Sequence, residues 1–145
     1  MSLTSAYMER EQRLQLINYI VDDVNETDYS LAKLVYTIYK DQYCITLCGN
    51  TEKWFKYNGT NWQLSSDIRH ELKRKISEEV TQFISDARTK LRNELISSTI
   101  DSSFSEIRLK RLVIVEQNLY NTRIKDRILK ECESLFFKKE LPVHS

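Results

Sequence analysis

The amino-acid sequence predicts a mainly α-helical α+β fold, in which a helical bundle packs on an antiparallel sheet of two or three strands. Apolar residues recur every three or four positions through most of the 145 residues, which is the spacing of one face of a helix. The chain has only 2 glycines and 1 proline, too few for a loop-rich all-β fold. Between positions 43 and 64 the pattern changes to short β-branched and aromatic runs, which favour strands.

Helical periodicity predicts five helices. We expect them at about 4–21, 29–41, 67–97, 105–118 and 121–137. Thr27 or Asp28 can cap the second helix, because either side chain accepts a hydrogen bond from a free N–H group of the first turn. Apolar residues at steps of three and four are predicted to face the core, and these include Leu14 in the first helix and Ile107 in the fourth.

The segment between the second and third helices is typical of a small antiparallel meander. Asn58-Gly59 is the strongest hairpin signal, because both residues tolerate positive φ. Trp54 and Trp62 bracket this turn, so we predict that they form a cross-strand pair on one face of the sheet. Aromatic residues on strands, Tyr57 among them, can stack on unpaired bases, but they more often pack a small sheet onto a helix. We therefore favour a structural role for this hairpin.

The chain has the length of one ordinary domain, and we interpret 1–145 as a single domain. Within it, 1–26 form an N-terminal helix and linker, 27–97 a helix, the hairpin and a long helix, and 98–145 the C-terminal helices. Hydrophobic residues make up 41% and charged residues 30%, which suits a folded core rather than a disordered chain. An odd number of cysteines, no secretion signal and no apolar run of about 18 residues predict a protein that is neither secreted nor membrane-bound.

The sequence lacks the usual patterns of catalytic and metal sites. A phosphate-binding loop of the type GxxxxGK[ST] does not occur. Cys44 and Cys48 would share one face of a strand, but a zinc site needs two more ligands nearby, and the only histidines are His70 and His144. We expect both cysteines to be small buried residues and His70 to be a solvated surface side chain. No catalytic residue, metal or cofactor is therefore predicted for this chain.

Basic residues recur at helical spacing in the second half of the chain. The net charge is only +1, so any nucleic-acid contact has to come from a local stripe of charge. Such Lys and Arg side chains bind phosphates without reading sequence, but acidic residues are interleaved, and most charged helix faces are merely solvated. Both interpretations stay open. The candidate nucleic-acid-binding residues are Lys73, Arg74, Arg88, Arg92, Arg108, Arg111, Arg123 and Arg127.

Three segments carry a more specific resemblance. They are DYSLAKLVYTIYKD at 28–41, WFKYNGTNW at 54–62 and LKRKISEEV at 72–80. In this order they resemble the N-terminal, pre-motor domain of the superfamily 3 helicase–primases of poxviruses, other large DNA viruses and phages. The resemblance covers roughly residues 28–140, and the hairpin is its most specific part, with Trp54, Tyr57, Gly59 and Trp62 as its structural residues.

This resemblance implies a non-catalytic accessory domain of a DNA replication protein. The implied roles are to link a primase module to an ATPase domain absent from this chain, to aid oligomer assembly and to contact single-stranded or forked DNA. The parent is expected to be an ATP-dependent DNA helicase that uses ATP and Mg²⁺ in the host cytoplasm or at a viral replication site. The residues alone leave two alternatives, a helical protein–protein interaction module and a stand-alone nucleic-acid-binding protein.

Overall fold

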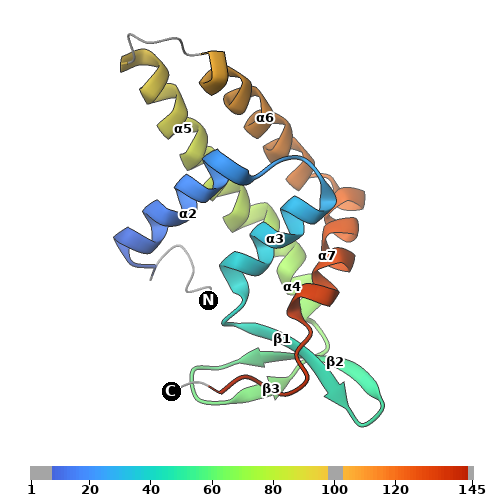
Figure 1. The fold of residues 1–145 in the computed structure, drawn as a ribbon. Helices are drawn as coiled ribbons and strands as arrows, with labels where there is room; N and C mark the ends of the chain where they lie inside the picture. The colour runs from blue at the N-terminus through green and yellow to red at the C-terminus, as the bar shows by residue number, and fades with distance from the viewer. Residues whose placement is uncertain (1–7, 98–102, 144–145) are drawn as a thin grey trace.

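The computed structural model describes residues 8–97 and 103–143, and it confirms a helical bundle on a three-stranded antiparallel sheet (Figure 1). The helices lie on one side of the sheet, and α5 and α6 run beside each other away from it. The elements are α2 (Arg10–Asp23), α3 (Asp28–Tyr39), β1 (Tyr43–Cys48), β2 (Thr51–Tyr57), β3 (Trp62–Leu64), α4 (Ile68–Lys75), the π-helical turn η1 (Ile76–Val80), α5 (Thr81–Ser97), α6 (Ser103–Leu119) and α7 (Thr122–Phe136).

The first two helices begin at polar residues that satisfy free N–H groups. Helix α2 starts at Arg10, later than the predicted residue 4, and the side chain of Gln12 accepts a hydrogen bond from the Glu9 N–H group. Positions 4–7 lie outside the described residues. The cap predicted for α3 is confirmed, because Thr27 Oγ1 accepts from the Ser30 N–H group at 3.2 Å.

Two apolar residues that were predicted to face the core are instead exposed. Leu14 is 52% exposed, because the buried side of α2 is formed by residues 16, 17 and 20. Ile107 is 58% exposed, because Arg108 takes the inward position beside it on α6. The other predicted core positions include Ile17 and Ile20 on α2 and Leu112 and Val115 on α6, and these four residues are buried as predicted.

The predicted pairing of Trp54 with Trp62 is wrong. The loop that joins β2 to β3 has four residues, 58–61, so Trp62 pairs with Tyr57. Trp54 pairs with Ile45 on β1. Side chains alternate across a strand, so Trp54 and Tyr57 point to opposite faces of the sheet, and the two tryptophans do so as well. Gly59 occupies this loop with a φ of 97°, a conformation that glycine adopts without strain.

The longest predicted helix is continuous from Ile68 to Ser97, but a π-helical turn interrupts its α-helical geometry at residues 76–80. Ile76 and Val80 in this turn are fully buried. The extra residue of a π-turn changes the phase of the helix, and such turns occur frequently at functional sites. The turn separates α4, which contacts the sheet, from α5, which packs on α2 and α6.

Phe136, at the end of α7, joins the helical layer to the sheet. Its ring lies 5.0 Å from the ring of Tyr36 on α3 and 5.4 Å from that of Trp54 on β2, measured between centroids. The chain then continues along β1, where Phe137 forms a parallel bridge with Ile45. Figure 1 shows this segment crossing the sheet towards β3. Three strands are too few to form a stable unit without such packing.

We predict that Phe136→Ala destabilises the protein by about 3–5 kcal/mol, because it removes a fully buried ring and leaves a cavity between α3 and the sheet. Phe104→Ala is the matched control, since Phe104 is 71% exposed and its truncation should change the free energy of unfolding by less than about 0.5 kcal/mol. Urea denaturation, monitored by circular dichroism, measures the free energy of unfolding of both variants. Equal effects of the two substitutions would contradict this account of the core.

Candidate nucleic-acid interface

The inner side of α4 is held by a buried lysine. Lys75 is only 2% exposed, and its ammonium group lies 5.3 Å from the ring centre of Tyr39 and 5.0 Å from that of Tyr43. Its Nζ also donates to Gln42 Oε1 at 3.4 Å. Burial lowers the pKa of Lys75, and the carboxylates of Glu71 and Glu79 oppose this shift. A buried cation is tolerated here because aromatic faces and acidic groups surround it.

The two tyrosines each donate a hydrogen bond to a glutamate. Tyr39 Oη donates to Glu79 Oε1 at 2.7 Å, and Tyr43 Oη donates to Glu71. Burial raises the pKa of both tyrosines far above the usual value, and the adjacent glutamates raise it further. Lys56 on β2 completes the network with a contact to Glu71 Oε1 at 2.8 Å. The network therefore attaches α4 and η1 to the end of α3 and to the sheet.

With its inner side held in this way, the outer side of α4 forms a groove with the start of α7. The groove has a volume of about 350 Å³ and is lined by His70, Lys73, Arg74, Ser77, Glu78 and Lys125. We call this set of residues the basic groove. Three of its residues are cationic and one is anionic at neutral pH, so it carries a local positive charge that the net charge of the chain does not reveal.

Polar contacts join the two walls of the basic groove. Lys125 Nζ lies 2.5 Å from Ser77 Oγ, and Lys73 Nζ lies 2.9 Å from Asp126 Oδ1. The hydrogen bond from Lys73 lowers the pKa of Asp126. On one wall, Arg74 forms an i,i+4 ion pair with Glu78 at 2.7 Å. Exposed ion pairs of this kind contribute about 0–1 kcal/mol, so these cations can exchange a carboxylate for a phosphate at little cost.

The other predicted basic residues do not converge on this groove. Two of them form ion pairs across helices, with Arg88 Nη1 3.0 Å from Glu116 and Arg127 Nε 2.9 Å from Asp28. A weaker pair at 3.7 Å joins Arg111 to Glu26.

Arg92 and Arg123 are exposed, and neither forms an ion pair within the described part of the chain. Arg108 differs from all the other candidates, because it is 7% exposed and its Nε donates to the carbonyl oxygen of Val21 at 2.6 Å. This contact satisfies a carbonyl group near the C-terminal end of α2. Arg108 is therefore a structural residue, and a phosphate outside the protein cannot reach it.

Four of the six residues that line the basic groove were not among the predicted nucleic-acid-binding residues, and these are His70, Ser77, Glu78 and Lys125. Lys125 reaches the groove only because the start of α7 packs against α4 and η1, whereas Ser77 lies one helical turn from Lys73. The spacing of Ser77 four residues after Lys73 was a usable signal, since it places both on one helix face. No comparable signal in the sequence connects Lys125 with α4, because 48 positions separate Lys125 from Ser77.

Metal ligands do not gather anywhere in residues 8–97 and 103–143, where no cluster of three or more His, Cys, Asp or Glu side chains could hold an ion. Cys44 is buried as expected, whereas Cys48 is exposed because β1 extends beyond the core at its hairpin end. His70 lies at the rim of the basic groove, as predicted for a surface histidine, and His144 lies outside the described residues. No described helix has the length and apolar character needed to cross a membrane.

The fold and the basic groove together define a helical domain with a β-meander and a positively charged surface groove. A protein-family model described as D5 N terminal like matches residues 32–144. The chain belongs to this family, the N-terminal domain of D5-like viral and phage helicase–primases. The match confirms the resemblance in the hairpin and the flanking helices, and it includes every residue of the basic groove. A comparison with curated proteins found no match.

We predict that the free energy of unfolding of Glu71→Gln depends less on pH in the acidic range than that of the wild type. Burial alone would raise the pKa of Glu71, but hydrogen bonds from Lys56 and Tyr43 outweigh burial and lower it. A lowered folded-state pKa stabilises the protein above the unfolded value of about 4.3, and this contribution is lost as the pH falls below it.

At pH 7 the free energy of unfolding of the wild type should therefore be higher than that of Glu71→Gln. This difference between the two proteins should shrink as the pH falls below about 4.3. Urea denaturation across this range measures it. Glu52→Gln, at the exposed tip of the hairpin, serves as the control and should show no such change. A difference that stays constant with pH would refute the assignment of Glu71.

Proposed function

We propose that this chain is a non-catalytic accessory domain of a viral- or phage-type DNA replication helicase–primase and that it contacts the DNA backbone through the basic groove. The observation that carries the proposal is the convergence of Lys73, Arg74 and Lys125 on one groove of a domain that belongs to this family. Phosphate oxygens are bound by Lys and Arg side chains and by hydroxyl groups such as that of Ser77. Contacts of this kind supply affinity without sequence preference.

We further propose that the domain links a primase module to an ATPase module and aids oligomer assembly. Two groups of contacts support a positioning role. The Phe136 contacts and the Lys75 network make the helices and the sheet a single packed unit, which can hold neighbouring modules at a defined spacing. ATP and Mg²⁺ would then act in the ATPase module, while this domain contributes DNA contact and geometry.

A helical protein–protein interaction module is the second candidate, and one observation favours it. Ile96, Phe104 and Ile107 lie at the ends of α5 and α6 farthest from the sheet, and each is more than half exposed. Large exposed apolar side chains that occur together are typical of interaction surfaces. This candidate is compatible with the first, because the basic groove lies on α4 and α7 instead.

Binding of fluorescent single-stranded and forked DNA, measured by anisotropy over a range of salt concentrations, tests the proposal. We predict that affinity falls steeply with salt and that Arg74→Ala with Lys125→Ala weakens binding to all sequences alike. On single strands, the slope of log K against log salt should decrease by about 0.7 for each phosphate that the double variant no longer neutralises.

Lys53→Ala is the matched control, since Lys53 is an exposed cation near the tip of the β1–β2 hairpin and should leave both affinity and slope unchanged. Circular dichroism verifies that each variant is folded. If the double variant binds DNA as the wild type does, the basic groove is not the DNA-binding surface.

A further inference from the structure

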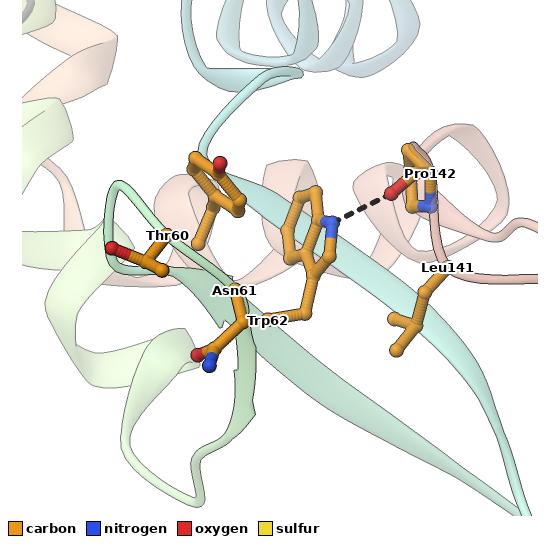
Figure 2. Close-up of a pocket in the computed structure, with 6 residues that line it drawn as sticks. Thr60, Asn61, Trp62, Leu141 and Pro142 are labelled. Carbon is orange, nitrogen blue, oxygen red and sulfur yellow. Dashed lines mark hydrogen bonds between the residues drawn. The ribbon is translucent and has the colours of Figure 1, made fainter. Parts of the chain in front are cut away.

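A second groove lies beside the loop between β2 and β3, on the sheet. It has a volume of about 340 Å³ and is lined by Tyr57, Thr60, Asn61, Trp62, Leu141 and Pro142. We call this set the aromatic groove. Figure 2 shows Trp62 between the loop residues Thr60 and Asn61 on one side and Leu141 and Pro142 on the other. None of the six residues is charged, which distinguishes this groove from the basic groove.

The two aromatic rings of this groove are held in place. Tyr57 and Trp62 are cross-strand partners, and their ring centres lie 5.3 Å apart at an interplanar angle of 56°. Trp62 Nε1 donates to the carbonyl oxygen of Pro142 at 2.9 Å (Figure 2). This bond fixes the edge of the indole, while Trp62 and Tyr57 both stay only half-buried. Aromatic rings held in this way lose little freedom when a flat ligand stacks on them.

The polar rim of the aromatic groove is also ordered. The side chain of Asn58 accepts from the N–H groups of Thr60 and Asn61, both at 2.8 Å, which holds the loop in one shape. The hydroxyl of Thr60 and the side-chain amide of Asn61 bond to no other residue in the described chain. An amide offers a donor and an acceptor side by side, and this arrangement matches the edge of a nucleobase.

We propose that the aromatic groove stacks one unpaired base of single-stranded DNA, with Asn61 and Thr60 on the base edge. The inference rests on the proposed function for the nature of the ligand, but it assigns a different site and a different chemistry. Uncharged aromatic linings bind the flat face of a base, whereas phosphates need cations. The domain then has two DNA contacts, one to the backbone in the basic groove and one to a base.

A proline-rich peptide is the competing occupant, since aromatic grooves also bind extended proline segments. Recognition of that kind uses the indole N–H as a donor to a peptide carbonyl. In this domain the chain's own Pro142 already accepts that bond, whereas the side-chain amide of Asn61 makes no hydrogen bond to another described residue. The geometry therefore favours a base over a peptide.

The test uses Trp62 as its own reporter. The chain has 2 tryptophans, so Trp54→Phe leaves Trp62 as the single one. Its fluorescence is recorded during titration with a twelve-base oligothymidylate and with an abasic strand that has the same number of phosphates. We expect quenching by the oligothymidylate alone, and affinity for it at least about fivefold higher than for the abasic strand.

Two variants serve as controls for this experiment. Trp62→Phe retains Trp54, which packs against Phe136, and the emission of Trp54 should stay constant during the same titration. Asn61→Ala should reduce the preference for the oligothymidylate over the abasic strand without altering binding of the abasic strand. Arg74→Ala with Lys125→Ala should weaken binding of both strands equally, because it removes only phosphate contacts.

The outcomes separate the two proposals. If both strands bind with equal affinity and Trp62 emission does not change, the stacking site is wrong and the proposed DNA contact through the basic groove stands. If neither strand binds at low salt, both proposals fail. If a proline-rich peptide quenches Trp62 and the oligothymidylate does not, the aromatic groove is a peptide site and the inference is overturned.

Discussion

The packing of Phe136 between α3 and the sheet is the contact on which the rest of the domain depends. A three-stranded sheet cannot bury enough surface to be stable alone, and Tyr36, Trp54 and Phe136 meet where the sheet packs on the helices. This contact also fixes the end of α7, and α7 together with the segment that follows it contributes to both grooves. Lys125 near its start belongs to the basic groove, and the segment that follows its end supplies Pro142 to the aromatic groove. One buried ring therefore sets the geometry of two surface sites.

Much of the fold follows from local sequence signals. Helical periodicity located the helices, and Thr27 identified the start of α3, because capping and amphipathic spacing act within a few residues. The pairing of Trp54 could not be predicted in the same way. Trp54 would lie opposite Trp62 only across a three-residue loop, 57–59, whereas the observed four-residue loop, 58–61, places Tyr57 opposite Trp62. The partner of Trp62 therefore shifts by three positions, and a shift of an odd number of positions moves a side chain to the opposite face.

The candidate site was predictable only in part, for a related reason. Lys73 and Arg74 could be proposed from the sequence because they belong to a run of basic residues on one helix, whereas Lys125 joins them through tertiary packing. Arg108 was predicted to be a surface cation from its position among other basic residues. In the structure it points inward and donates a hydrogen bond to the Val21 carbonyl at the end of α2. Helix periodicity describes one helix at a time, so it does not reveal which charged side chain a second helix covers.

The three consecutive basic residues of α4 show how strongly this matters for function. Lys75 is turned inward among tyrosines and glutamates, where its charge is balanced within the protein. Lys73 and Arg74 are turned outward, and their carboxylate partners are exposed enough to be exchanged. A buried charge of this kind adds little net stability, but breaking its network leaves an unpaired ion and is costly. The inner network therefore holds α4 in one orientation, and that orientation determines which of its cations face solvent and are available for the proposed DNA contact.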